Sequence, residues 1–228
     1  MEYKYESYGK CCYCNETVAQ NKMVKHLTSH LSSMEKEAKN TKANLTRYFH
    51  LKVDCGEMFL QILIKGKSSL DKLDDFLKDI WMECCGHMSA FRDNRIEISM
   101  SKKIEAVFIP KIKIRYDYDF GSTTSVNLTM ASSYDLDLKE NIILLSRNEP
   151  LKIMCASCKK TPAIYLCSTC IYEEYAFFCE KCGKKHEKVC HDFEDYSKMD
   201  VVNSPRMGVC GYSGGSIDLE RDGHYKGE

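Results

Sequence analysis

The stretch from Cys155 to Cys190 is the feature that most constrains how this chain can fold. It carries three Cys-x2-Cys pairs at equal intervals, followed by a histidine and another cysteine. A gap of two residues lets both thiolates of a pair bind one metal ion, and zinc takes four thiolate or imidazole ligands in a tetrahedral site. Eight ligands are enough for two closed zinc sites. The predicted ligands are Cys155, Cys158, Cys167, Cys170, Cys179, Cys182, His186 and Cys190, with His191 as an alternative to Cys190.

The fourteen cysteines could form disulfides or bind metal, depending on the compartment. The sequence starts MEYKYESYGK, which is polar and lacks the apolar stretch of a signal peptide. The longest nearly apolar run, Met58 to Ile64, is too short to cross a membrane. We therefore expect a cytoplasmic protein with no membrane partner, whose cysteines bind zinc and do not form disulfides.

A second metal-binding pattern, C-x2-C-x11-H-x3-H, lies near the N-terminus. Histidines four residues apart share one face of a helix and can bind one ion. The pattern resembles a ββα-type zinc finger of the Cys2His2 class, shortened by one residue in its middle, over residues 1–30. Its predicted ligands are Cys11, Cys14, His26 and His30, and Cys12 could replace Cys11. Its small core would contain Val18, Met23 and Leu27.

Such a finger can contact nucleic acid or serve as a structural or protein-binding unit. If His26 is the first ligand histidine, the base-contacting positions of the helix would be Ala19, Lys22 and Lys25. One finger covers only about three base pairs, and the zero net charge of the chain gives no general basic surface. Protein binding is therefore preferred, with nucleic acid bound by Lys22, Lys25 and the lysine-rich helical linker 31–47 as the alternative.

Residues 48–150 have the pattern of a mainly antiparallel sheet with a packed helix, an α+β domain. Half-buried strands are indicated by alternating apolar and polar residues, and one run, Met58 to Lys65, is apolar on both faces, as in an interior strand. From Ser68 or Ser69, apolar residues at helical spacing predict a helix that reaches Trp81. The predicted strands are 48–54, 58–65, 95–100, 111–120, 124–130 and 141–146.

Three phrases of this domain and of the tail resemble a known family. They are DDFLKDIWMECCGHMSAF (74–91), YDYDFGSTT (116–124) and NSPRMGVCGYSG (203–214). Together they resemble the plasmid pRiA4b ORF-3-like family, in the branch with a cysteine-rich C-terminal region. The resemblance covers residues 48–214 and implies an α+β fold with a zinc-bearing tail. It implies no particular activity.

The tail 151–200 is also similar to B-box-type cross-brace fingers, in which ligand pairs alternate between two metals. That resemblance implies that Cys155, Cys158, Cys179 and Cys182 bind one zinc. It implies that Cys167, Cys170, His186 and Cys190 (or His191) bind the other. The rival is sequential pairing, with the first four cysteines on one metal, and spacing alone does not decide between them. Short strands at 163–166 and 175–178 would hold the two sites together.

Two groups of residues could support catalysis. Cys84, Cys85 and His87 follow the predicted helix, and a thiol beside an imidazole can act as a nucleophile. The same residues could instead bind a further metal, with Cys55, or pack as small buried side chains. Asp117 and Asp119 share one strand face with Lys113 and Arg115. The two carboxylates could bind a divalent cation, although such residues more commonly form solvated ion pairs across strands.

The sequence thus predicts three folded parts, the finger, the central domain and the two-zinc tail, followed by a loop and tail over 201–228. Three zinc ions are expected. Closed zinc sites hold a fold together and leave no open position for catalysis. The predicted function is therefore that of an adaptor or recognition protein with a protein partner. Nucleic-acid binding and an enzyme that uses the residues named above are the alternatives.

Overall fold

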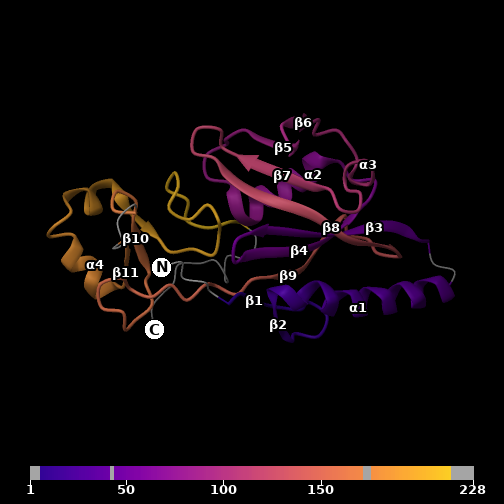
Figure 1. Ribbon diagram of the computed structural model, residues 1–228, viewed down its shortest axis with the longest axis horizontal. Helices are drawn as coiled ribbons and strands as arrows, with labels where there is room; N and C mark the ends of the chain where they lie inside the picture. The colour runs from indigo at the N-terminus through magenta and orange to yellow at the C-terminus, as the bar shows by residue number, and fades with distance from the viewer. Residues whose placement is uncertain (1–5, 42–43, 172–175, 217–228) are drawn as a thin grey trace. The chain divides into compact units, whose positions relative to one another are not determined.

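The computed structural model describes residues 6–41, 44–171 and 176–216, and it divides into two compact units (Figure 1). Unit 1 contains Met1–Phe76 and Met88–Glu149, and unit 2 contains Leu77–His87 and Pro150–Glu228. Lys42 of the predicted linker, the start of the predicted strand 175–178 and the predicted tail beyond Ser216 lie outside the described residues. None of the helices in the described ranges has the length and apolarity that a membrane span requires.

Unit 1 is built on a seven-stranded sheet in the order β6-β5-β7-β8-β3-β4-β9, with every neighbouring pair antiparallel. The predicted α+β class with a mainly antiparallel sheet is therefore confirmed. The doubly apolar strand β4 lies inside the sheet, between β3 and β9, as its sequence predicts. The strands are β3 (Thr46–Cys55), β4 (Met58–Lys65), β5 (Ser89–Asp93), β6 (Ile96–Ile98), β7 (Lys113–Tyr118), β8 (Thr124–Leu136) and β9 (Ile142–Arg147).

The N-terminal segment forms a small hairpin, β1 (Tyr8–Lys10) and β2 (Thr17–Ala19), followed by the long helix α1 (Gln20–Asn40). The helix continues well beyond His30, so its second half occupies most of the predicted linker. Leu27 and Leu31 are fully buried in a core that also contains Tyr48 and Leu63 of the sheet. The Glu35 carboxylate accepts the backbone N–H of Asp135 in β8 at 2.8 Å. The finger and the sheet therefore share one hydrophobic core.

The predicted helix at 70–81 consists of α2 (Leu70–Leu77) and a π-helical turn, η1 (Lys78–Met82). The chain passes from unit 1 into unit 2 between Phe76 and Leu77, at the end of α2. In the view of Figure 1, α1 and α2 lie on opposite sides of the central strands of unit 1. A short helix, α3 (Ile104–Val107), and strand β5 are two elements that the sequence patterns do not predict. Of the apolar positions predicted to face the core, Leu70, Leu73, Leu77, Ile80 and Trp81 are fully buried.

Unit 2 contains a three-stranded sheet in the order β11-β10-β12, the helix α4 (Glu180–His186) and a π-helical turn, η2 (Phe193–Ser197). Strand β10 (Tyr165–Cys167) overlaps the predicted strand 163–166 and ends one residue beyond it, and β11 (Phe177–Phe178) falls within the predicted strand 175–178. The third strand, β12 (Lys198–Asp200), is not predicted by the sequence patterns, because its three residues have no apolar alternation.

The positions of three carboxylates differ from the sequence prediction. The apolar spacing of the predicted helix puts Asp74 on its polar face, but Asp74 is buried and accepts hydrogen bonds from Ser89 Oγ at 2.6 Å and Tyr116 Oη at 2.8 Å. Asp117 and Asp119 were expected on an exposed strand face and are also buried. Lys113 and Arg115 on the same face of β7 are exposed, and Asp117 is buried beneath its partners Arg92 and Arg115.

Candidate metal centres

Among the described residues, four groups of cysteine and histidine side chains bring their ligand atoms within 4.8 Å of one another. These groups could hold metal ions. We name them the finger cluster (Cys11, Cys14, His26, His30), the first tail cluster (Cys155, Cys158, Cys179, Cys182), the second tail cluster (Cys167, Cys170, His186, Cys190) and the helix-end cluster (Cys84, Cys85, His87, Cys210). The first three contain all of the ligands that the sequence predicts.

The spacing of the sulfur atoms suits metal coordination. Zinc–sulfur bonds of about 2.3 Å place two ligand sulfurs of a tetrahedral site about 3.8 Å apart. The observed separations are 3.9 Å between Cys158 and Cys179, 3.9 Å between Cys167 and Cys190, and 4.0 Å between Cys170 and Cys190. A disulfide would require about 2.05 Å, and all fourteen cysteines are free.

The finger cluster is formed by the turn between β1 and β2 and by the first half of α1. The backbone carbonyl of Cys11 accepts the N–H of Asn15. The φ of Asn15 is 60°, which turns the chain so that Cys14 faces the helix. Cys14 Sγ lies 3.3 Å from His26 Nε2, and the other ring nitrogen of His26 lies 3.8 Å from the Glu16 carboxylate. A carboxylate on the second nitrogen is the usual way to orient a ligand histidine. Cys12, the alternative ligand, is exposed and lies outside the cluster.

The first tail cluster repeats the same turn. The backbone carbonyl of Cys155 accepts the N–H of Lys159, whose φ is 55°. Lys159 therefore has the same place in this turn as Asn15 has in the turn of the finger cluster. The Thr161 hydroxyl, 3.5 Å from the Cys158 thiol, and the backbone N–H groups of Lys160 and Thr161 lower the pKa of Cys158 to about 5. Hydrogen bonds to the charged form favour the thiolate, which is the form that binds metal.

The second tail cluster lies between β10, α4 and the chain after α4. The ring of His186 stacks on Phe178 at 4.2 Å and meets Phe193 edge-on at 4.9 Å, so two aromatic rings fix its orientation. Burial and the neighbouring thiols Cys167 and Cys190 raise the pKa of Cys170 to about 12. Although burial acts in the opposite direction, hydrogen bonds from Ser197, Cys170 and Cys190 lower the pKa of Cys167. The thiolate of Cys167 therefore disfavours a second thiolate beside it, and a divalent cation between the sulfurs would relieve that repulsion. Cys190 belongs to the cluster, whereas His191 is exposed and does not.

The ligand atoms of the tail are grouped alternately along the chain. The first and third Cys-x2-Cys pairs lie together, and the second pair lies with His186 and Cys190. Phe178 and Phe193 pack with cysteines of both clusters in one small core. This is the grouping that the alternating pairing predicts, and sequential pairing would have brought the first and second pairs together.

The helix-end cluster brings Cys84, Cys85 and His87 together with Cys210, whereas Cys55 belongs to none of the four groups found in the described part of the chain. Cys85 Sγ lies 2.9 Å from His87 Nε2 and 3.5 Å from Cys210 Sγ. The sequence reasoning missed Cys210, because it stands alone in a loop without a second cysteine at metal-binding spacing. The glycines around it, Gly208 and Gly211, were a sign that the chain turns tightly there.

The two strand carboxylates have separate partners and do not converge. Asp117 accepts hydrogen bonds or ion pairs from Arg92 Nε at 3.2 Å, Arg115 Nε at 3.0 Å and Ser125 Oγ at 2.6 Å. Asp119 has φ of 62° and accepts the backbone N–H groups of the following turn at 3.0 and 3.2 Å. Asp117 therefore connects neighbouring strands, and Asp119 closes the hairpin turn.

No family model matches this chain, and no match was found among the curated proteins. Among solved structures, the chain is similar to the crystal structure of a protein of unknown function, MM3350, from Methanosarcina mazei Go1. The two are 15% identical, with a TM-score of 0.39, and the similarity covers 46% of this chain and 70% of MM3350.

Proposed function

We propose that this protein is a zinc-binding recognition protein, in which structural zinc ions hold surfaces that contact a partner protein. The observation that carries the proposal is the convergence of thiol and imidazole groups, at tetrahedral spacing, in the finger cluster and both tail clusters. Thiolate and imidazole ligands in sets of four favour zinc over the oxygen-loving cations. Membership of the pRiA4b ORF-3-like family is part of the same proposal and rests on the sequence phrases alone.

A structural role fits the closed ligand sets. Each of these three clusters offers four protein ligands, so a bound zinc has no vacant position for water or substrate. The core around the two tail clusters is small and consists of Phe178, Phe193 and the cysteines themselves, with Tyr165 packed against it. In such a small unit, metal binding supplies most of the free energy of folding.

The surface beside the second tail cluster favours protein recognition. Val189 directly precedes the ligand Cys190, and its side chain is 76% exposed. Tyr196, on η2, is 68% exposed. Large apolar side chains held on a rigid, metal-bound surface are typical of contact sites. Exposed lysines precede Val189 and exposed carboxylates precede Tyr196, so both signs of charge are available to a partner around these apolar side chains (Lys185, Lys188, Glu194 and Asp195).

Metal analysis tests the zinc part of this proposal. Protein purified without chelator should contain at least three zinc ions per chain, measured by mass spectrometry under native conditions. Removal of the metal should unfold the tail, seen as loss of hydrogen-exchange protection in β10 and β12. One zinc ion or fewer per chain would contradict the proposal.

Site-specific photocrosslinking tests the recognition part. A photoreactive phenylalanine analogue at Tyr196 should crosslink one predominant protein in extracts of the source cells, and Val189→Asp should abolish the crosslink while the zinc content stays the same. The matched control carries the analogue at the exposed residue Ile96 of unit 1. Identical crosslinks from both positions, or none from Tyr196, would contradict a contact surface there.

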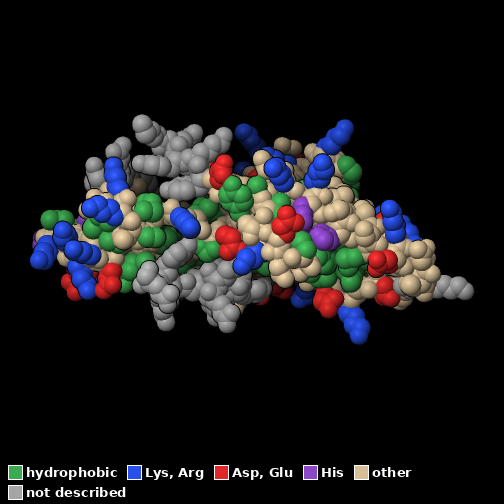
Figure 2. All heavy atoms as spheres, turned by 90° about the horizontal axis from the view of Figure 1, so that it is seen from below, with side chains coloured by type: hydrophobic (Ala, Val, Ile, Leu, Met, Phe, Trp, Pro, Cys, Tyr) green, Lys and Arg blue, Asp and Glu red, His purple; other side chains and the backbone are tan. Residues whose placement is uncertain are grey.

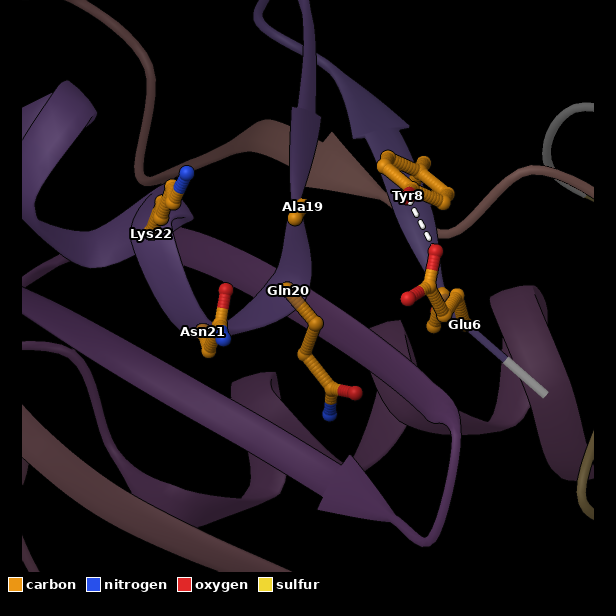
Figure 3. Close-up of a pocket in the computed structure, with 7 residues that line it drawn as sticks. Glu6, Tyr8, Ala19, Gln20, Asn21 and Lys22 are labelled. Carbon is orange, nitrogen blue, oxygen red and sulfur yellow. Dashed lines mark hydrogen bonds between the residues drawn. The ribbon is translucent and has the colours of Figure 1, made fainter. Parts of the chain in front are cut away.

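Nucleic-acid binding is a second candidate, supported by the placement of the two finger lysines. Lys22 and Lys25 are exposed on α1, and Lys22 borders an open depression of about 320 Å³ together with Gln20 and Asn21 (Figure 3). Two other basic residues of this region are already engaged, because Lys39 pairs with Glu35 at 3.0 Å and Arg47 pairs with Asp135. In Figure 2, Lys and Arg side chains are spread over the visible face and do not form one continuous stripe.

A mobility-shift assay distinguishes the two candidates. If nucleic acid is the ligand, the protein should shift single- or double-stranded DNA or RNA at low salt, and Lys22→Ala with Lys25→Ala should weaken the shift. Lys113→Ala, at an exposed residue of strand β7, is the matched control and should leave the shift unchanged. No shift at low salt with any of these nucleic acids would remove this candidate.

The enzyme alternative has less support. Asp117 and Asp119 have separate partners, and Cys84, Cys85 and His87 lie in a four-ligand group with Cys210. The depression beside Lys22 contains none of these residues, and neither does a second one near Ser69 and Lys103.

A further inference from the structure

The helix-end cluster differs from the other three clusters in how the chain forms it. Three of its members, Cys84, Cys85 and His87, directly follow η1, and the fourth, Cys210, comes from the loop 203–215 of the same unit. The vicinal sulfurs of Cys84 and Cys85 are 3.7 Å apart, and Cys210 Sγ is 3.4 Å from His87 Nε2. These separations match sulfur–sulfur edges of about 3.8 Å and slightly shorter sulfur–nitrogen edges in a tetrahedral zinc site.

The turn after η1 is shaped to present its ligands together. Gly86 has φ of 78°, and its N–H donates to the Glu83 carboxylate at 2.5 Å. A residue with a side chain would be strained at this φ, whereas glycine is not. The chain reverses at Gly86 and brings His87 back beside Cys85. The two residues are two positions apart in the sequence, and Cys85 Sγ contacts His87 Nε2.

The loop is fixed to the end of the helix by its own hydrogen bonds. Ser204 Oγ donates to the carbonyl of Trp81 at 2.6 Å and accepts the N–H of Arg206 at 2.9 Å. Further along, a Cβ on Gly215 would clash with the backbone carbonyl oxygens of Asp79 and Ile80, so the loop backbone lies directly against η1. Both ends of the loop are therefore anchored, and Cys210 lies between them.

Cys210 itself has an unfavourable backbone conformation. Its φ is 54°, in the left-handed region, which costs a residue with a side chain of the order of 1 kcal/mol or more. Gly208 and Gly211, on either side, have φ of 79° and 65°, so three left-handed residues turn this short segment. Such strain persists where surrounding interactions hold it, and a bond from Cys210 Sγ to a metal is an interaction of that kind.

A buried cation adjoins the cluster. Arg206 is fully buried, and its guanidinium donates to Cys84 Sγ at 3.6 Å. Three thiolates, one neutral imidazole and one Zn²⁺ carry a net charge of −1, which the guanidinium balances. A buried charge needs a counter-charge, and hydrogen bonds to a ligand sulfur are typical of the surroundings of metal sites.

We propose that the helix-end cluster is a fourth metal site, which binds one zinc ion through Cys84, Cys85, His87 and Cys210 and so fastens the loop 203–215 to the end of η1. The proposal does not depend on the recognition function. It assigns these residues a structural role in place of thiol catalysis, because four protein ligands leave the thiols occupied. Two of the four ligands, Cys85 and Cys210, are exposed, more than in any other cluster. This ion should therefore be the first one that a chelator removes.

The metal content of single variants of the full chain tests the site. Native mass spectrometry should give four zinc ions for the wild type, three for Cys210→Ser and four for the matched control Cys55→Ser, whose cysteine lies outside all clusters of the described residues. Hydrogen exchange should become faster in 203–215 of Cys210→Ser and stay unchanged in 155–190. Cys210→His keeps a ligand at this position and should retain four zinc ions. After cobalt replaces zinc, the thiolate-to-cobalt charge-transfer absorbance of this variant should be lower than that of the wild type by the contribution of one thiolate.

Three results would overturn the fourth site. One is a count of three zinc ions for both the wild type and Cys210→Ser, which would show that the helix-end cluster binds none while the other zinc sites are intact. Another is a disulfide between two of Cys84, Cys85 and Cys210 in protein purified under reducing conditions. The third is an alkylating agent that modifies Cys85 at the same rate with and without zinc. A wild type without any zinc would overturn this site and the proposed function together.

Discussion

The Sγ atoms of Cys158 and Cys179 lie 3.9 Å apart, although the second Cys-x2-Cys pair stands between them in the sequence. Cys167 and Cys170, the pair that is skipped, lie instead against Cys190 at 3.9 and 4.0 Å. Each tail cluster therefore contains residues from both ends of the tail. If two metals bind there, neither half of the tail can complete a site alone, and the two sites should fold together.

Pairs of substitutions distinguish the alternating arrangement from the sequential one. With alternating sites, Cys158→Ser and Cys179→Ser damage the same site, so the double variant should lose one zinc ion. Cys158→Ser combined with Cys170→Ser damages both sites and should lose two. Sequential binding predicts the reverse. Zinc counts from native mass spectrometry provide the measurement.

Loss of one tail zinc could unfold the whole tail and release both ions, so a second measurement uses the intact protein. After replacement of zinc by ¹¹³Cd, the cysteine β-protons couple to the cadmium that they bind. Cys158 and Cys179 should correlate with one cadmium resonance, and Cys170 and Cys190 with the other. Correlations of Cys158 and Cys170 with the same resonance would contradict the alternating arrangement.

The sequence predicts those features that depend on local spacing. The Cys-x2-Cys turns, the strand alternation of β3, β7 and β8 and the apolar face of α2 all have a short period, and the α+β sheet follows from them. Contacts between distant segments have no such period. Cys210 reaches Cys85 across 125 residues, and nothing near Cys210 in the sequence identifies its partner. Likewise, alternation alone places Asp117 on a solvent-facing side of its strand. Its burial depends on Arg92, which is on another strand, and the pattern of β7 does not reveal that partner.

The shared core of α1 and the sheet leads to a prediction about Leu31. This residue follows His30, the last member of the finger cluster, and it is fully buried with Tyr48 and Leu136 of the sheet. Leu31→Ala should destabilise unit 1 by about 2–5 kcal/mol, the usual cost of emptying a buried leucine site. Hydrogen exchange of the slowest amides in β3 and β8 measures this free energy without requiring the whole chain to unfold in one step.

The matched control for Leu31 is Lys36→Ala, on the exposed side of the same helix, which should change the stability by less than about 0.5 kcal/mol. If Leu31→Ala leaves the exchange of β3 and β8 unchanged, the finger helix and the sheet are independent units. That result would contradict the common core.

Asp117 tests whether the strand carboxylates are structural. Its side chain is 7% exposed and lies between Arg92 and Arg115, so Asp117→Ala would remove a carboxylate that both guanidinium groups contact, although Arg92 also pairs with Glu97 at 3.2 Å. Because the Arg115 side chain is 49% exposed, the loss should cost about 1–2 kcal/mol, less than for a fully buried pair. The control Asp75→Ala breaks an exposed pair with Lys72 and should cost less than about 1 kcal/mol. An Asp117→Ala variant as stable as the wild type would make catalysis the better explanation for this residue.

His50 should make the stability of unit 1 depend on pH. Its side chain is fully buried in β3, and its Nε2 lies 2.7 Å from the acceptor Gln61 Oε1, so Nε2 carries a proton. Its Nδ1 is buried without a hydrogen-bond partner, which favours the neutral imidazole. Burial lowers the pKa of His50 to about 4, and the hydrogen bond to Gln61 offsets part of this effect. The unfolded chain has a histidine pKa of about 6.5. Between these values the unfolded state binds a proton that the folded state does not.

The contribution of His50 to stability is therefore complete above about pH 6.5 and is lost as the pH falls to about 4, with a total loss of about 3 kcal/mol. Acid also protonates metal ligands, so the comparison is made with His50→Gln, in which metal loss is the same but this titration is absent. From pH 6.5 to 4.5, the free energy of unfolding of unit 1 should fall more steeply for the wild type than for the variant. Equal slopes, or a His50 proton resonance that titrates near pH 6.5 in the folded protein, would show that the imidazole is accessible to protons and would contradict its burial as a neutral group.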